Sequence, residues 1–326
     1  MERSQRRWAR FGWWTLAAVV ALCVLAAPWS FGAVRIEKID FPRYAASNLE
    51  LNRLPPIWRE LAPDEAERLR AAEESKAYIP GRVLGTDALG RDMLARLLAG
   101  GIFSMTVGFS SAAVAVAIGT LWGSFAGFAG GRVDALLMRT VDVLYGLPSI
   151  LLVVLLAVAV EGVIGRGGGG LSEGQSRMLD LAVLLVAIGG TSWLTMSRVI
   201  RGQVLSLRAQ PFMESCRAVG VPASRQFFRH VLPNLVGTMV VYATLTVPAA
   251  ILSESFLSFL GIGVREPVPS WGNLASTGLG EVNLVNSRWW LLAAPCVMIA
   301  LTLVALNFVG DSLRARVDPT ASRARW

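Results

Sequence analysis

The segment QPFMESCRAVGVPASRQFFRHVLPN spans residues 210–234 and separates two long hydrophobic runs. Pro211 suits the first turn of a helix, because the missing N–H is not needed there. Gly220 suits the left-handed residue that follows a last helical turn. The segment therefore predicts a short helix over residues 211–219.

A second short helix is predicted directly after the first. Pro222 presets its start, Leu232 ends it, and Pro233 is expected to close it at the membrane. Arg225 and Arg229 fall on polar positions, with aromatic and aliphatic residues on the others. Such a unit against the inner membrane face is typical of a docking surface, and a hairpin that only rests on lipid is the alternative.

The composition places the flanking runs in a membrane. Of the 326 residues, 54% are hydrophobic and only 17% are charged, and the mean hydropathy is +0.52. Crossing a bilayer takes about 20 apolar residues. Windows of this kind occur at residues 13–34, 97–131, 143–160, 181–197, 231–253 and 289–310. We expect an all-α polytopic protein with six transmembrane helices and both termini on one side.

Arginines decide the orientation, because basic residues collect in cytoplasmic loops. With the termini inside, the cytoplasmic segments hold 16 arginines and five acidic residues, whereas acidic and basic residues balance in the external segment. The predicted order is a cytoplasmic N-terminus at 1–12, a first span at 13–34, an extracytoplasmic segment at 35–96, a transmembrane core at 97–310 (helices 2–6) with a cytoplasmic loop at 198–234, and a cytoplasmic tail at 311–326.

Several function classes are disfavoured by what the chain holds. The net charge of +8 reflects membrane topology, and no basic domain studded with aromatic residues indicates nucleic-acid binding. Cys23, Cys216 and Cys296 show no spacing typical of disulfides or metal sites. The two lysines, Lys38 and Lys76, do not follow a glycine loop, so no Walker ATPase is predicted.

The external segment contains an acidic stretch, DEAERLRAAEESK, at residues 64–76. Pro63 precedes it and is suited to open a helix. The stretch therefore predicts a helix that is either a cap or partner surface, or a plain solvated helix.

The spacing of Glu214-Ser215-Cys216, Gly220 and His230-Val231-Leu232-Pro233 resembles the EAA loop of ABC-importer permeases, E-A-A-x3-G-x9-I-x-L-P. In that family the loop is the coupling helix, which seats in a cleft on a cytoplasmic ATPase. The resemblance implies that this chain is not an enzyme, has no cofactor of its own, and works with two ATPase subunits that bind ATP and Mg. The residues expected to form the coupling surface are Pro211, Phe212, Met213, Glu214, Ser215, Cys216, Arg217, Ala218, Gly220, Leu232 and Pro233.

Other segments are similar to the C-type permease subunits of dipeptide, oligopeptide and nickel importers. They are LGTDALGRDMLARLLAG (84–100), GGRVDALLMRTVD (130–142), RVIRGQVLSLR (198–208), ESFLSFLGIGV (254–264), PSWGN (269–273) and NFVGDSLRARVDP (307–319). The resemblance implies a type I importer permease in a bacterial inner membrane. Its implied partners are a second permease subunit in a heterodimer, an extracytoplasmic solute-binding protein and membrane lipid.

The implied substrate is a peptide or a related small solute, with a nickel chelate or another non-peptide solute as the alternative. One departure is Ile102, where relatives commonly place an arginine two residues before the serine that is Ser104 here. Glu254 is an ionisable group inside a span, which is costly unless it faces protein or water. With Ser255 and Ser258 it is a candidate for the translocation pathway or for a hydrogen bond between packed helices.

Two other classes of function compete with the permease. A stand-alone channel or secondary carrier often shows inverted repeats and charged pairs near the midplane, and only Glu254 is a buried candidate. A membrane-embedded enzyme needs clustered catalytic groups, and the single histidine, His230, stands at an apolar position of the motif. We predict a packing or interface role for His230.

Overall fold

The computed structural model describes residues 2–36, 38–165, 173–283 and 287–317, which are mostly helical. The chain divides into two compact units. Unit 1 consists of Met1–Trp13, Val107–Ser253 and Ala305–Trp326, and unit 2 consists of Trp14–Thr106 and Glu254–Val304. Long helices continue from one unit into the other.

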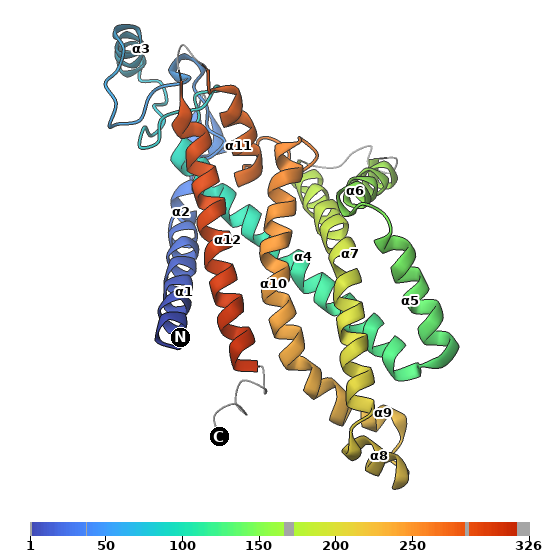
Figure 1. The fold of residues 1–326 in the computed structure, drawn as a ribbon. Helices are drawn as coiled ribbons and strands as arrows, with labels where there is room; N and C mark the ends of the chain where they lie inside the picture. Colours follow the sequence, from blue (N-terminus) through green and yellow to red (C-terminus); the bar gives the residue numbers. More distant parts are fainter. Residues whose placement is uncertain (1, 37, 166–172, 284–286, 318–326) are drawn as a thin grey trace. The chain divides into compact units, whose positions relative to one another are not determined.

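Figure 1 shows the long helices of the described chain. They are α1 (Glu2–Leu25), α4 (Met93–Ala129), α7 (Glu173–Arg208), α10 (Leu232–Phe259) and α12 (Trp289–Val317). Among the described residues, five helices are long and apolar enough to cross a membrane. The helix ends lie outside several predicted windows, because a hydropathy window detects only the apolar middle of a helix that continues into water.

The predicted third span at 143–160 is not one straight helix. It falls on α5 (Gly131–Tyr145) and α6 (Ser149–Gly165), which are bent by 97° at a short break. Pro148 lies in the break, where its ring and missing N–H oppose a continuous helix. The total is six spans only if this bent pair counts as one.

The core of unit 1 is built around α7. Met196, Ile200 and Val204 of α7 are buried in one cluster with side chains from the segment after it. Glycines let α4 come close to α7: a Cβ on Gly123 would lie 2.2 Å from the carbonyl oxygen of Ser197. The short helices α8 (Pro211–Ala218) and α9 (Ala223–Gln226) lie at the end of α7 (Figure 1).

The two ends of the chain are neighbours within unit 1. The rings of Trp8 and Phe308 stack with centroids 5.4 Å apart. Gly12 faces the same helix, since an added Cβ would lie 2.6 Å from the Cβ of Phe308. Residues 318–326 of the predicted tail lie outside the described residues.

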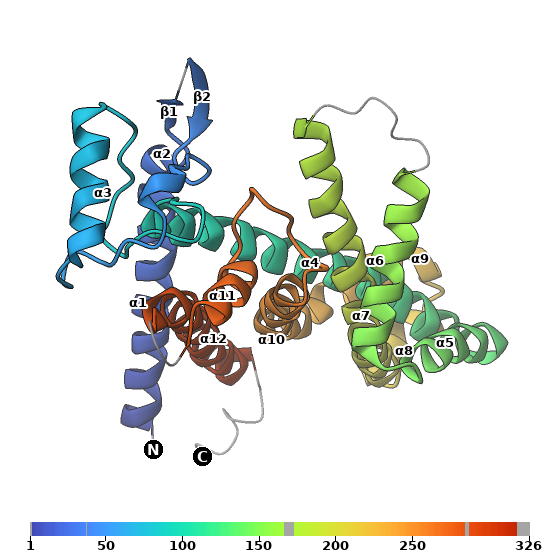
Figure 2. The same ribbon diagram turned by 90° about the horizontal axis from the view of Figure 1, so that it is seen from above.

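Unit 2 contains the segment 35–96, which was predicted to be external, and its shorter helices are α2 (Ala27–Ser30), η1 (Leu49–Leu51), α3 (Pro63–Glu74) and α11 (Trp271–Gly280). Helix α3 confirms the helix predicted after Pro63. A hairpin of β1 (Ala33–Ile36) and β2 (Ile39–Pro42), drawn in Figure 2, was not predicted. Its four-residue strands are too short for sequence periodicity to reveal.

Candidate functional site

Helix α8 has the limits that the sequence predicts, to within one residue. Pro211 stands in its first turn, and Gly220 follows its C-cap with φ of 77°. The Gly220 N–H donates to the Arg217 carbonyl, and the Val221 N–H donates to the Cys216 carbonyl. The nitrogen–oxygen distance is 3.0 Å in both bonds. These two bonds form a Schellman motif, which satisfies carbonyls that the helix end leaves open.

One side chain anchors α8 to the rest of unit 1. Met213 is 1% exposed and packs in a cluster with Ile200 of α7 and Leu235 of α10. A guanidinium nitrogen of Arg217 also donates to the carbonyl of Arg208 at 3.1 Å. Motion of α8 is therefore tied to two membrane helices.

The other side of α8 is open. Glu214 and Ser215 are exposed, as are Phe212 and Ala218, while Cys216 is partly exposed. The Ser215 hydroxyl only returns to the carbonyl of its own helix. The exposed side of α8 thus carries one acidic side chain, Glu214, beside Ser215 and Phe212.

The predicted end of the second helix at Pro233 is wrong. After α9 the chain forms a π-helical turn, η2 (Phe227–Val231), and then enters α10 without a break. Proline opposes an α-helix because its ring clashes with the carbonyl four residues earlier, and the wider turn relieves this crowding. The side chain of Asn234 donates to the carbonyl of His230 at 2.6 Å.

Two residues of the predicted coupling surface therefore lie outside helix α8. Leu232 and Pro233 are the first residues of α10 and are not part of α8. Leu232 lines an apolar cavity beside α4. His230 is partly buried, with its ring centroid 6.3 Å from that of Phe212, in agreement with the packing role predicted for it.

Glu254 is enclosed by hydroxyl groups of unit 2. It has no exposed surface, and the Ser258 hydroxyl donates to its Oε1 at 2.8 Å. Ser255 lies 3.4 Å from Oε2, and the hydroxyls of Ser104 and Ser270 also bond to this carboxyl group. Of its two candidate roles, this geometry favours a hydrogen bond between packed elements.

The PSWGN motif builds this same region. Ser270 caps α11: its Oγ accepts the backbone N–H of Asn273, and its own backbone N–H donates to Oδ1 of Asn273. Trp271 is fully buried, and its indole N–H donates to the Leu97 carbonyl at 3.0 Å. Gly272 allows α11 to touch α10, since a Cβ would lie 2.2 Å from the Ser255 carbonyl oxygen. The motif is thus explained by packing.

A cluster of ion pairs at the start of α4, in which Arg91 and Arg96 are buried and Glu266 is exposed, was not predicted. Arg91 Nε lies 2.7 Å from Asp87 Oδ2, and Arg96 NH2 lies 2.8 Å from Glu266 Oε1. Glu266 also pairs with Arg91. The alternation of charges in LGTDALGRDMLAR was the available signal, but nothing in the sequence indicates that Glu266 joins them.

Asp92 begins α4 next to this cluster. Its Oδ1 accepts the backbone N–H of Leu94 at 2.9 Å and that of Ala95 at 3.2 Å. Burial raises the pKa of the Asp92 carboxyl, and these hydrogen bonds offset the effect only in part. The carboxylate therefore caps the helix at an electrostatic cost.

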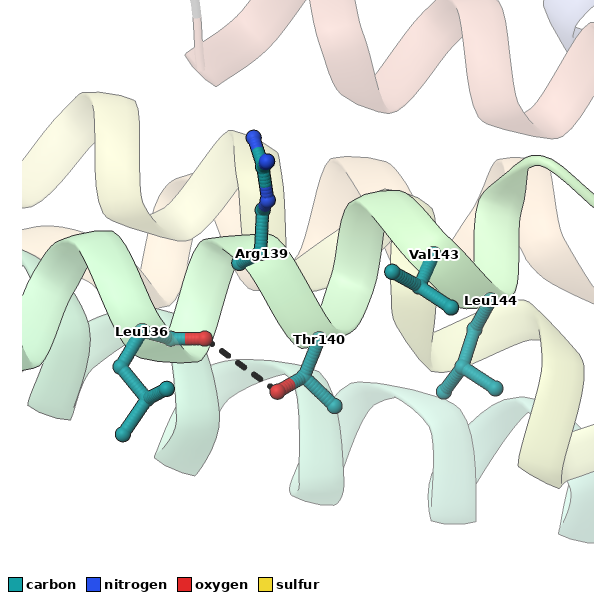
Figure 3. A pocket seen from close by; sticks show the side chains of 5 residues that line it. All are labelled: Leu136, Arg139, Thr140, Val143 and Leu144. Atoms are coloured by element: carbon teal, nitrogen blue, oxygen red, sulfur yellow. Dashed lines mark hydrogen bonds between the residues drawn. The ribbon is translucent and has the colours of Figure 1, made fainter.

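A shallow pocket on α5 offers little chemistry. Figure 3 shows its lining, in which the Thr140 hydroxyl is bonded to the Leu136 carbonyl of the same helix at 3.2 Å. Arg139 is the charged group there. Among the residues that the structure describes, no group of three His, Cys, Asp or Glu side chains fits a metal ion.

The sequence profile of one family, described as "Binding-protein-dependent transport system inner membrane component", matches residues 119–323. This chain belongs to that family.

Curated relatives of this inner membrane component carry names from peptide transport. The oligopeptide transport system permease protein OppC of Haemophilus influenzae is 41% identical over 72% of this chain and 69% of its own. The OppC of Escherichia coli K12 is 41% identical over 82% of this chain and 81% of its own. The dipeptide transport system permease protein DppC of Bacillus subtilis is 38% identical over 81% of this chain and 76% of its own.

A solved structure shares the fold of this family member. It is that of the MetNI methionine ABC transporter in inward-facing conformations, with a TM-score of 0.54 and 16% identity, over 69% of this chain and 98% of that chain. The family membership decides against a stand-alone carrier or a membrane-embedded enzyme. The chain is an ABC-importer permease with an all-α fold.

Proposed function

We propose that this permease is one half of the transmembrane pathway of a peptide importer. The relatives named for oligopeptide and dipeptide transport support this substrate class, at 38–41% identity. The second candidate is a nickel chelate or another small solute. It rests on the sequence resemblance alone, so peptides are favoured.

The coupling role is carried by one observation. Helix α8 is closed by the Schellman motif at Gly220, is anchored through Met213, and leaves Glu214 and Ser215 uncovered. A short rigid helix attached to α7 and α10 transmits force to both when a partner moves it. We infer that two cytoplasmic ATPase subunits, which bind ATP and Mg, hold α8 in a cleft.

The remaining partners follow from that role. A second homologous permease completes the pathway as a heterodimer, and an extracytoplasmic solute-binding protein delivers the peptide. The protein lies in the inner membrane of a bacterium, with both termini and α8 in the cytoplasm. Approach of the ATPase subunits shifts the pathway between two access states, as in other two-state switches.

A thiol-directed photocrosslinker tests the contact. Cys216 is partly exposed on α8, while Cys23 is buried and Cys296 lies in α12. Benzophenone-maleimide placed on Cys216 in the complete complex should capture an ATPase subunit upon illumination. The Cys216→Ser variant supplies the control for labelling at the other two cysteines. Capture of the solute-binding protein instead would refute the orientation.

A pair of glycine substitutions tests the coupling. Gly220→Val forces a β-branched residue into a left-handed conformation, so peptide uptake should be lost although the complex remains in the membrane. Gly202→Val is the matched control, because Gly202 is an exposed helical residue with nothing within 4 Å of an added Cβ. Equal uptake by the two variants would contradict the proposal.

The substrate is tested separately. The solute-binding protein of the same transporter should bind unlabelled dipeptides or oligopeptides in calorimetry and should not bind nickel chelates. The reverse result would keep the permease role and change the substrate.

A further inference from the structure

An apolar cavity of about 510 Å³ lies in unit 1 between the last third of α4 and the α9–η2–α10 junction. Its walls are largely aromatic: Phe125 and Phe128 come from α4, and Phe227 and Phe228 come from η2. Phe125 and Phe228 are more than 60% exposed. The cavity is therefore an open slot in the surface, within the size range of small-ligand sites, about 300–1,000 Å³.

Two hydroxyl groups in this apolar slot have no partner. Thr120 is 5% exposed and Ser124 is 2% exposed, and both line the cavity. Neither hydroxyl makes a hydrogen bond within the described structure. In contrast, the hydroxyls of Ser197 and Thr302 return to a backbone carbonyl of their own helix. Since buried polar groups are normally paired, an acceptor atom of a ligand in the slot would satisfy both hydroxyls.

Two arginines stand beside the mouth of the slot. Arg225 and Arg229 line an adjoining hollow that shares Ser224 and Phe228 with the cavity. Both are exposed, and neither has an ion-pair partner among the residues that the structure describes. Their spacing of four places them on one face of the α9–η2 segment. The site thus combines an apolar slot, buried donors and uncompensated positive charge.

We propose that this site binds one anionic phospholipid of the inner leaflet. An acyl chain fills the slot, Thr120 and Ser124 donate to an ester oxygen, and the headgroup phosphate meets Arg225 and Arg229. The inner-leaflet assignment rests on the orientation proposed above. Basic pockets on the cytoplasmic side of membrane helices are suited to anionic headgroups, because that leaflet carries negative charge.

A lipid fits these observations better than a protein partner does. A helix has a diameter of about 10–12 Å with its side chains, and covering the slot with one would leave the two hydroxyls without the flexible acceptor that an ester supplies. A protein surface would also need carboxylates placed opposite both arginines. A lipid brings the apolar tail, the acceptor and the anion in one molecule.

The location suggests what the lipid does. The slot is walled by the π-helical turn that joins α8 to α10, and wide turns of this kind are frequent at functional sites. An occupied slot braces η2 against α4. The bound lipid is therefore expected to stiffen the connection through which α8 acts on the membrane helices.

The test uses the complete transporter in vesicles of phosphatidylethanolamine with a photoactivatable phosphatidylglycerol. Crosslinks should map by mass spectrometry to residues 120–128 and 223–232. Excess phosphatidylglycerol should compete, and phosphatidylcholine should not. An arginine near a membrane surface contributes a factor of about five in affinity, so Arg225→Gln with Arg229→Gln should lower labelling about 25-fold.

Matched variants separate this site from general surface charge. Arg139→Gln removes an exposed arginine of α5 and should leave the labelling unchanged. Labelling that is the same in the double variant as in the unchanged protein overturns the proposal. Competition by excess phosphatidylcholine that equals the competition by excess phosphatidylglycerol also overturns it. So does a Leu121→Cys variant that crosslinks this slot efficiently to another polypeptide of the complex. Labelling of the slot without capture of an ATPase through Cys216 would retain the lipid site and reject the coupling role.

Discussion

Replacing Met213 with alanine should loosen α8 without unfolding the membrane helices. Met213 is 1% exposed and is the buried side chain of an eight-residue helix. Truncating a buried methionine to alanine costs about 2–5 kcal/mol. Since about 1.4 kcal/mol is a factor of ten, the equilibrium for local opening of α8 should rise at least about 30-fold.

Hydrogen exchange of the assembled complex measures this opening. Amides of α8 should exchange faster in Met213→Ala, whereas those of α7 around Ile200 should be unchanged. Peptide uptake per ATP hydrolysed should fall, because a loose α8 transmits less motion. Phe212→Ala, on the exposed side of the same helix, should have little effect on α8 exchange. Unchanged exchange of α8 in the Met213 variant would refute the anchor.

Three further predictions concern side-chain packing and ion pairs within unit 1 or within unit 2. Gly90→Ala should lower the melting temperature strongly, because Gly90 has φ of 68° and an added Cβ would lie 1.8 Å from the Asn48 carbonyl oxygen. Arg201→Gln should cost about 1–3 kcal/mol in denaturant unfolding by removing the paired hydrogen bonds to Asp134; a second change, Asp134→Asn, should add less than its own single effect. Burial raises the pKa of Asp92, so its charged form is penalised at neutral pH. Thermal stability should therefore rise as the pH falls through that raised pKa, and Asp92→Asn should abolish the rise.

Local signals in the sequence were sufficient for α8. Proline at its start and glycine at its end act through neighbouring backbone atoms, so no distant contact has to be known. Met213 appeared only as one member of an apolar face. Its role as the anchor depends on Ile200 and Leu235, which are 13 and 22 residues away in sequence, and only the fold brings them together.

Other features depend on contacts that a linear reading does not show. Pro233 was expected to end a helix, but a single π-helical turn accommodates it, and local proline and capping signals do not indicate such a turn. The enclosure of Glu254 needs hydroxyls from α4 and from the start of α11 as well as from its own helix. Hydropathy located the apolar residues of α6, but a mean over a window carries no information about a bend.

The junction η2 also fixes how α8 is oriented about the axis of α10. A π-helical turn contains one residue more than the α-helical turn it replaces, and one residue corresponds to a rotation of about 100° and a rise of about 1.5 Å. Deleting one residue within 227–231 would remove this extra residue and return Pro233 to a regular α-helical turn, where its ring clashes with the carbonyl four residues earlier. A deletion two turns further into α10 would rotate α8 by about 100° about the axis of α10, so the orientation of α8 depends on keeping the number of residues unchanged at both places.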